Sequence, residues 1–298
     1  HIKGVIYMPA ITPKQKINQV KMFGGDNIEI VLTGDTFDDC QAQALEFTRE
    51  RNKIFIPPFD HLKVIEGQGT VGKEILDDVS GIDYIFIPIG GGGLCAGIGE
   101  YFKTLSPATK LIGVEPAGAP SMTEALKAGK PVRLEKIQRF VDGASVQKVG
   151  NITFQLCKDV LADILLVPEG KVSSTILQLY NEDAIVAEPA GALSIAALDQ
   201  YADKLEGKKV VCILSGGNND IDRMQEIKEL SLLYEGLKHY FIIRFPQRPG
   251  ALKQFVNQVL APEDDITRFE FIKKTERERG PALVGIELVD WPVAVGIG

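Results

Sequence analysis

From residue 4 to residue 214, short apolar runs rich in β-branched residues alternate with longer amphipathic stretches. A continuous apolar run predicts a strand buried on both faces, and an amphipathic stretch between two such runs predicts a crossover helix. This order predicts an α/β domain with a doubly wound, mostly parallel sheet. We expect strands at residues 4–8, 28–32, 54–56, 84–89, 111–115, 164–167 and 210–214, and helices that include residues 37–51, 94–105 and 152–161.

The pattern changes after residue 222. We expect a charged helix, then a strand, a Pro-Gly turn, a helix, a strand, a charged turn and a strand, at residues 223–237, 240–245, 246–250, 251–260, 266–273, 274–280 and 282–288. These elements form the first part of a βαββαβ module, whose second helix and last strand we expect to be missing. Because the chain starts within an apparent strand without a methionine, we also expect loss at its N-terminus. Residues 291–298 match no pattern.

Composition excludes several classes of function. The net charge of −7 leaves no basic face for nucleic acid, and no apolar stretch approaches the roughly 18 residues of a membrane span. The four cysteines lie too far apart in the sequence for a zinc motif or a disulfide scaffold, which favours the reducing cytoplasm: Cys40, Cys95, Cys157 and Cys212. A small neutral or anionic metabolite is the expected ligand.

Four consecutive glycines, Gly90 to Gly93, follow the expected strand 84–89 and precede the expected helix at Leu94. Glycine allows positive φ and lets a ligand approach the main chain. Backbone N–H groups and the positive end of a helix dipole would converge there on an anion. The loop therefore predicts a phosphate-binding site.

Two ligands suit such a loop. The spacing Gly91-x-Gly93-x-x-Ala96, with Glu115 at the end of the next strand, satisfies the dinucleotide pattern and allows an NAD-dependent dehydrogenase. A second turn, "LSGGNND", places Ser215 at the same expected carboxyl edge of the sheet. Its hydroxyl could reach one end of a flat cofactor whose phosphate lies at the four glycines.

Seven segments together resemble one family: "PPFDH", "EGQGT", "PIGGGGL", "GVEPAGA", "FVDGASVQKVG", "AEPAGALS" and "LSGGNND". The series resembles the pyridoxal-phosphate (PLP) enzymes of the tryptophan-synthase-β fold type, specifically the biosynthetic threonine dehydratases. The segments "HYFIIRFPQRPGAL", "DDITRFEFIKK" and "GPALVGIEL" resemble the ACT-like regulatory domain of the short form of that enzyme.

The resemblance implies conversion of L-threonine, and possibly L-serine, to a 2-oxo acid and ammonia, at the head of isoleucine synthesis. It implies that the PLP phosphate is held by Gly90, Gly91, Gly92, Gly93 and Leu94, and that Ser215 hydrogen-bonds the pyridine nitrogen. A neutral hydroxyl partner leaves the ring weakly protonated, which suits β-elimination.

The resemblance also exposes a departure from the family pattern. The family's Schiff-base lysine lies in a Ser-Phe-Lys-x-Arg-Gly context and its ring-contacting asparagine in Ser-x-Gly-Asn-His, and neither occurs in this sequence. No catalytic residue is therefore assigned, and we expect the chain to be an incomplete piece of the enzyme. A catalytically inert binding protein stays open as a third hypothesis beside the lyase and the dehydrogenase.

The resemblance divides the chain into a remnant of the small catalytic domain (1–55), a PLP-binding large domain (56–235) and a regulatory module (236–298). The module would bind isoleucine or valine, or serve only subunit contact in a homo-oligomer. Residues 142–144 are expected to form a loop over the cofactor, and Glu188 is interpreted as a helix N-terminal residue. No catalytic role is assigned to His61 or His239, and nothing in the sequence suggests a metal.

Overall fold

The computed structural model describes residues 2–10, 12, 14–35, 37–271 and 279–288. The chain divides into two compact units, His1–Pro58 and Phe59–Gly298. Most of the charged turn expected at 274–280 and the tail 291–298 lie outside the described residues. In the part of the chain that is described, no helix is long and apolar enough to cross a membrane.

The first unit is a small parallel sheet with helices. Strand β1 (Gly4–Met8) pairs in parallel with β2 (Ile28–Leu32), and both strands form where the sequence predicts them. Helix α1 (Lys14–Gly24) connects them and α2 (Phe37–Glu50) follows. Helix α2 packs against β1 through the Phe47 and Tyr7 rings, whose centroids lie 5.7 Å apart.

The expected strand at 54–56 is wrong. Residues 53–57 form no strand, and Ile54 and Ile56 are 90% and 78% exposed. The run is only three residues long and is followed by Pro57 and Pro58, which cannot donate to a sheet ladder. The segment is instead an extended connection between the two units.

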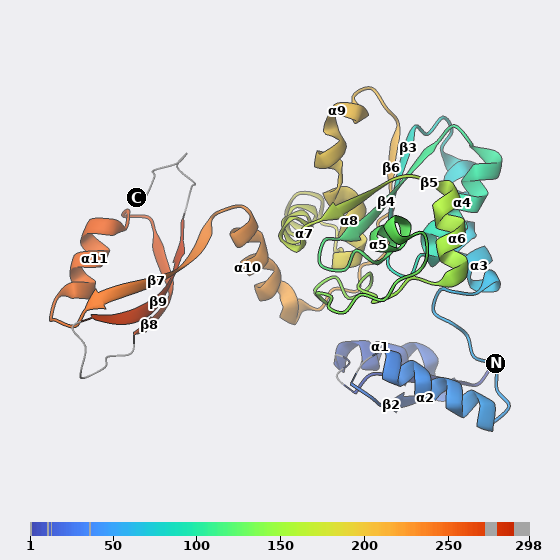
Figure 1. Cartoon of the computed structure of the whole chain (residues 1–298), viewed down its shortest axis with the longest axis horizontal. Coiled ribbons are helices and arrows are strands. Elements are labelled where there is room, and N and C mark those ends of the chain that lie inside the picture. Colours follow the sequence, from blue (N-terminus) through green and yellow to red (C-terminus); the bar gives the residue numbers. More distant parts are fainter. Residues whose placement is uncertain (1, 11, 13, 36, 272–278, 289–298) are drawn as a thin grey trace. The chain divides into compact units, whose positions relative to one another are not determined.

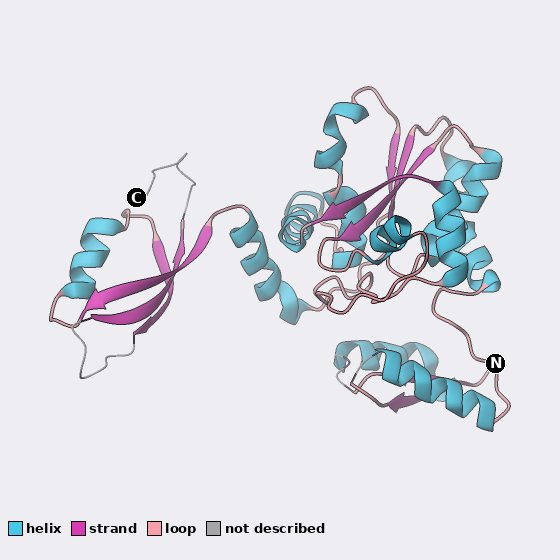
Figure 2. Cartoon of the chain, in the orientation of Figure 1, coloured by secondary structure: helices cyan, strands magenta, loops and turns pink. Residues whose placement is uncertain are grey.

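The second unit is built on a four-stranded parallel sheet in the order β5-β4-β3-β6 (Figure 1). Its strands are β3 (Tyr84–Pro88), β4 (Lys110–Pro116), β5 (Leu161–Val167) and β6 (Val210–Cys212). Helices lie on both sides of this sheet (Figure 2). The helices of this part of the chain are α3 (Leu62–Asp78), α4 (Gly93–Leu105), α5 (Ser121–Ala128), α6 (Asn151–Val160), α7 (Glu169–Asp183), α8 (Pro189–Ala196) and α9 (Ala202–Leu205), followed by α10 (Met224–Tyr234), which packs against α7.

Every residue of β3 is buried, and successive side chains enter different cores. Tyr84 and Phe86 join a core with residues of α7 and α8, whereas Ile85 and Ile87 join one with residues of α3, α4 and α6. Successive side chains of a strand point to opposite faces, so a sheet covered on both faces needs a continuous apolar strand. The doubly wound α/β fold follows from this requirement.

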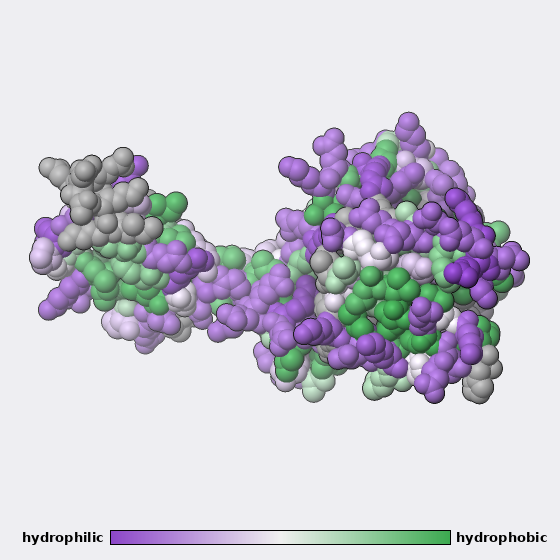
Figure 3. All heavy atoms as spheres, turned by 90° about the horizontal axis from the view of Figure 1, so that it is seen from below, coloured by the Kyte–Doolittle hydropathy of each residue, from purple (hydrophilic) through white to green (hydrophobic). Residues whose placement is uncertain are grey.

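The regulatory module is an antiparallel sheet in the order β7-β9-β8 with one helix. Its elements are β7 (Lys238–Pro246), α11 (Ala251–Val259), β8 (Asp265–Phe271) and β9 (Arg279–Glu287), in the order expected from the sequence. Phe245 is the centre of its core, with Phe255, Phe269 and Phe271 within 5.3 to 6.2 Å between ring centroids. Green, hydrophobic side chains cover part of this module in Figure 3, and Ile242 and Val259 are among its exposed apolar residues.

Candidate functional site

The glycine loop, Gly90 to Gly93, lies where β3 ends and α4 begins. Gly92 is the N-terminal cap of α4 and has φ of +94°, a conformation that strains any residue with a side chain. The first N–H groups of a helix have no partner within it. The loop therefore presents backbone donors and a helix dipole at the carboxyl edge of the sheet, as the sequence predicts.

The loop is closely packed on several sides. A side chain at Gly91 would collide with the ring of Phe59, and a Cβ at Gly90 would lie 2.9 Å from Cα of Ala144. Thr153 Oγ1 donates a hydrogen bond of 2.7 Å to the Gly91 carbonyl. Because this carbonyl is held from α6, the orientation of the neighbouring peptide groups is restrained before any ligand arrives.

Helix α6 is fixed in turn by Asp60, a residue more than 90 positions away in sequence. Its carboxylate accepts from the backbone N–H groups of Asn151, Ile152 and Thr153, at 2.9, 2.9 and 3.1 Å. An acidic side chain at a helix N-terminus satisfies unpaired donors and favours the helix dipole. The "PPFDH" segment thus supplies two supports of the glycine loop, the Phe59 ring and the Asp60 cap.

The second glycine turn opens at the same edge. Strand β6 is the parallel neighbour of β3, with Phe86 paired to Cys212, and Ser215 follows β6 as an exposed residue. The Gly216 carbonyl accepts from the backbone N–H of Glu188 at 3.0 Å. The two glycine turns therefore leave adjacent strands side by side.

Close contacts connect these segments into one site. Ala144 touches Gly90, Gly143 lies against Glu188, and Glu188 also lies against Gly216. Glu188 precedes α8, as interpreted from the sequence, but its side chain makes no capping hydrogen bond and its carboxylate faces Gly143 and Gly216. Four sequence motifs thus meet at one edge of the sheet.

These residues fit a phosphate-bearing cofactor. The glycine loop is bare backbone at a helix N-terminus, where Ala144 and Phe59 leave no room for a Cβ, and Asn219, beside the second glycine turn, keeps a buried side-chain oxygen without a hydrogen-bond partner among the described residues. A buried acceptor left unpaired is costly. Both features are those of a surface shaped for a polar ligand.

Glu115 does not have the role that a dehydrogenase requires. Its carboxylate is fully buried and accepts from Met122 N at 2.6 Å and from Thr123 N and Oγ1 at 2.9 and 2.7 Å, so it caps α5. Burial raises the pKa of Glu115 to about 7, and the N–H bonds oppose this rise. The carboxylate is engaged within the protein and cannot bind a ribose, so the dehydrogenase hypothesis is wrong.

Other polar residues have structural roles. His61 is the N-terminal cap of α3, with Nδ1 accepting from Lys63 N at 3.2 Å, and His239 Nε2 bonds the Gly236 carbonyl at 2.8 Å. Cys157, distant in sequence from Cys95, lies beneath the glycine loop, where its Sγ is 3.6 Å from the Gly92 carbonyl oxygen; a hydrogen bond with Cys95 that favours the neutral Cys157 thiol, together with burial, raises the pKa of Cys157. No sequence spacing predicts this thiol pair, because α4 and α6 meet only in the folded protein.

The fold and this site define a pyridoxal-phosphate-dependent enzyme. The family of that description matches residues 1–216, and the C-terminal regulatory domain of threonine dehydratase matches residues 229–291. The chain is 61% identical over 288 residues to L-threonine dehydratase biosynthetic IlvA of Halalkalibacterium halodurans, which covers 96% of this chain and 69% of that protein. It is 58% identical over 288 residues to L-threonine dehydratase biosynthetic IlvA of Bacillus subtilis, which covers 96% of this chain and 68% of that protein. This chain belongs to the biosynthetic L-threonine dehydratase family, whose members are PLP-dependent ammonia-lyases.

Solved structures agree with this assignment. The processed form of threonine deaminase isoform 2 from Solanum lycopersicum superimposes with a TM-score of 0.73 at 41% identity, covering 78% of this chain and 63% of that one. The threonine deaminase of T.th. gives a TM-score of 0.68 at 33% identity, covering 74% of this chain and 71% of that one. The chain therefore spans slightly under two thirds of the Solanum lycopersicum protein and about two thirds of its bacterial relatives.

Proposed function

We propose that this chain supplies the cofactor cradle and the regulatory module of an L-threonine dehydratase that feeds isoleucine synthesis. The single observation that carries the proposal is the meeting of the glycine loop, the 142–144 loop, Glu188 and the Ser215 turn at one edge of the sheet. In this arrangement Gly90 to Gly93 and Leu94 hold the PLP phosphate and Ser215 faces the pyridine nitrogen. Bound PLP supplies an electron sink that makes the Cα proton of an amino acid acidic.

The residues of this chain bind and orient the cofactor, and no proton transfer is assigned to them. The backbone donors of the glycine loop and the α4 dipole neutralise phosphate charge. A hydroxyl at Ser215 gives the ring nitrogen a neutral partner. The cofactor loops do not read the substrate's methyl group, so L-serine is a second substrate to be compared. The four free cysteines support a reducing, cytoplasmic location.

Cofactor binding tests this proposal directly. Equilibrium dialysis of the chain against pyridoxamine 5′-phosphate and against pyridoxamine separates the phosphate contribution from that of the ring. We expect measurable binding of the phosphorylated compound only. Ser215→Ala should weaken it modestly, while Ser173→Ala, a buried serine of α7 that bonds the Glu169 carbonyl, should not. Equal binding of both compounds would refute the phosphate cradle.

Turnover is tested in the intact enzyme by following 2-oxobutyrate from L-threonine. We expect the 298-residue chain alone to form none above background, because it contains no Ser-Phe-Lys-x-Arg-Gly segment. Substantial turnover by the chain alone would show that another lysine serves. Sedimentation of the intact enzyme tests the proposed homo-oligomer.

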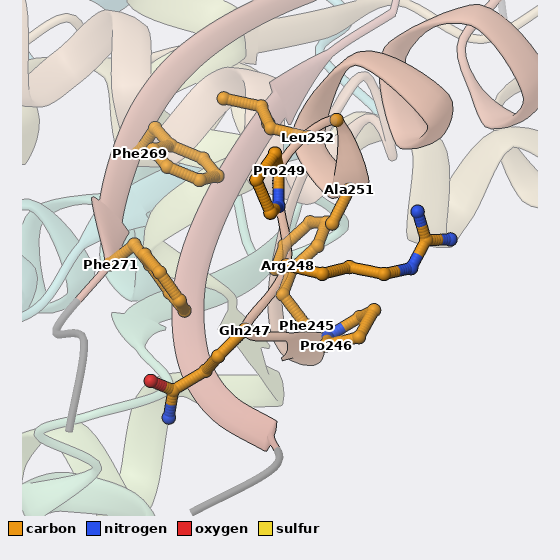
Figure 4. A pocket seen from close by; sticks show the side chains of 10 residues that line it. Phe245, Pro246, Gln247, Arg248, Pro249, Ala251, Leu252, Phe269 and Phe271 are labelled. Carbon is orange, nitrogen blue, oxygen red and sulfur yellow. The ribbon is translucent and has the colours of Figure 1, made fainter. Parts of the chain in front are cut away.

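We propose that the regulatory module binds isoleucine or valine. A cavity of about 270 Å³ lies between the aromatic rings of β8 and the turn that follows β7 (Figure 4). This is near the lower limit of ligand pockets, about 300–1,000 Å³, as a single amino acid requires. Phe245, Phe269 and Phe271 offer an apolar surface for a branched side chain.

Polar groups at the same cavity suit an amino-acid headgroup. Gln247 has a buried side-chain nitrogen without a hydrogen-bond partner among the described residues, and Gly250, with φ of +85°, is the N-terminal cap of α11. Both can donate to a carboxylate. Isothermal titration with isoleucine, valine and the larger phenylalanine tests the site; Phe271→Ala should weaken binding of the branched ligands. No heat with either branched amino acid would favour a purely structural module.

A further inference from the structure

We propose that Arg223 is a positioning residue: it holds the segment 140–144 against the glycine loop, and helix α10, which begins beside it, links that segment to the regulatory sheet. The proposal rests on the proposed function to the extent that the glycine loop is the cofactor cradle. It concerns contacts that no feature of the sequence indicates.

The segment 140–144 depends on its neighbours for its position. Residues 131–150 contain no helix or strand, so no ladder of backbone hydrogen bonds fixes them. Val141 and Ala144 are nevertheless buried, and Ala144 lies against the backbone of Gly90. A long irregular segment keeps one conformation only where contacts from other elements restrain it. Any shift of this segment is therefore felt directly at the glycine loop.

Arg223 provides such a restraint from outside the segment. Its Nη2 donates to the Phe140 carbonyl at 2.6 Å, its Nη1 lies 3.4 Å from Asp142 Oδ1, and its guanidinium carbon lies 5.1 Å from the centroid of the Phe140 ring. A planar guanidinium can donate in two directions and stack on a ring at once, whereas a lysine ammonium cannot reproduce that geometry. One side chain thus grips a backbone carbonyl, a carboxylate and a ring of the same segment.

The position of Arg223 in the chain joins two parts of the site. It lies eight residues after Ser215, and its backbone N–H donates to the Asp220 carbonyl at 3.0 Å. The turn that carries Ser215 therefore continues directly into the residue that holds the segment 140–144. Both walls of the cofactor site share this anchor.

The middle of α10 contacts the regulatory sheet. Glu229 accepts hydrogen bonds from Lys238 and Tyr240 of β7, and Lys228 Nζ lies 3.6 Å from Glu287 Oε1 of β9. Glu229 is the sixth residue after Arg223, about 9 Å away along a helix axis. Because a helix moves as a rigid element, a displacement of β7 that shifts α10 on α7 also shifts Arg223.

Amide hydrogen exchange measured by mass spectrometry tests the first part of the proposal. We expect Arg223→Gln to speed exchange in residues 138–146 by about tenfold, the effect of losing one charge-assisted hydrogen bond. Exchange in β3 and α4 should not change, and Arg223→Lys should recover part of the protection. Lys103→Gln, which removes an exposed positive charge from α4, is the matched control. Unchanged exchange in 138–146 with Arg223→Gln would overturn the proposal.

Affinity for pyridoxamine 5′-phosphate provides the second readout. We expect Arg223→Gln to weaken binding about fivefold or more while amide exchange in β3 and α4 stays the same, with partial recovery in Arg223→Lys. If the unaltered chain binds no phosphorylated cofactor, the proposed function fails, but the exchange measurement still decides the role of Arg223. If exchange responds and affinity does not, positioning of the cofactor loop by Arg223 is refuted.

A double-mutant cycle tests the link through α10. Glu229→Gln removes the charged partner of Lys238. As a single substitution, it should alter amide hydrogen exchange in residues 138–146. When Glu229→Gln is added to Arg223→Gln, it should have no further effect, because the contact of Arg223 with the segment 140–144 is already lost. Additive effects, or no effect of Glu229→Gln on this segment, would refute the link.

Discussion

Replacing Thr153 by valine tests whether the glycine loop is oriented from α6. Thr153 is fully buried, and its hydroxyl donates to the Gly91 carbonyl at 2.7 Å. Valine keeps the shape and removes the donor. The backbone N–H of Gly150 also donates to this carbonyl, but at 3.4 Å it is a weaker bond that compensates only in part.

The expected magnitude follows from the loss of one partner of a buried hydrogen bond. A buried acceptor left wholly unsatisfied costs about 1–3 kcal/mol, and because the long bond from Gly150 remains, we expect a loss near the lower end of that range in the free energy of unfolding. A loosened loop must also be ordered when phosphate binds, so affinity for pyridoxamine 5′-phosphate should fall several-fold, up to about tenfold for 1.4 kcal/mol.

Urea denaturation and equilibrium dialysis measure the two effects separately. Thr153→Ser keeps the hydroxyl and should lose stability through the missing methyl group while retaining affinity. Thr175→Val is a matched control, because the Thr175 hydroxyl bonds a carbonyl within α7 at 3.0 Å, away from the loop. If Thr153→Val binds cofactor as the unaltered chain does, the hydroxyl does not orient the loop and the reasoning fails.

Three further changes test other contacts. Asp60→Ala removes the shared acceptor of three N–H groups at the start of α6 and should cost about 2 kcal/mol in urea unfolding, with Asp60→Asn costing less; an unaffected midpoint would contradict the capping role. Burial raises the pKa of Glu115 from 4.5 to about 7, so the stability that its proton contributes is present below pH 4.5 and lost as pH rises through 7, and Glu115→Gln should flatten stability measured across that range. Burial alone would raise the pKa of Glu229, but hydrogen bonds from Lys238 and Tyr240 lower it overall. The stability that the Glu229 carboxylate contributes is therefore present above pH 4.5 and lost as the pH falls. Glu229→Gln should remove this loss of stability in acid, and an unchanged stability profile in acid would argue against the Glu229–Lys238 interaction.

Local sequence patterns predicted the helices and strands well where the element depends mainly on residues close together in the sequence. The runs at 4–8 and 28–32 form the strands β1 and β2 with the expected bounds, and the expected helices at 37–51, 94–105 and 152–161 differ from the observed ones by a residue or less at each end. The run at 54–56 failed because a strand needs a partner, and two prolines follow it. An apolar run in the sequence does not by itself predict whether another strand lies close enough to pair with it.

The candidate site shows the same division. The two glycine turns that carry Gly90 to Gly93 and Ser215 were predicted from sequence, since turn glycines at strand ends leave a local signature, and the cofactor contacts of these residues stay a prediction. Glu115 was misread because a spacing of about 20 residues says nothing of which way a side chain turns. The structure directs it to α5 instead.

The sequence by itself determined the alternation of strands and helices, the two glycine turns and the resemblance that identifies the family, because each is written in neighbouring residues. Only the tertiary structure decided that Asp60 caps α6, that Thr153 holds Gly91, that Cys95 meets Cys157 and that Arg223 grips the segment 140–144. These partners lie some 60 to 90 positions apart. They meet because the parallel sheet brings its loops to one edge, and no local pattern encodes which loops become neighbours there.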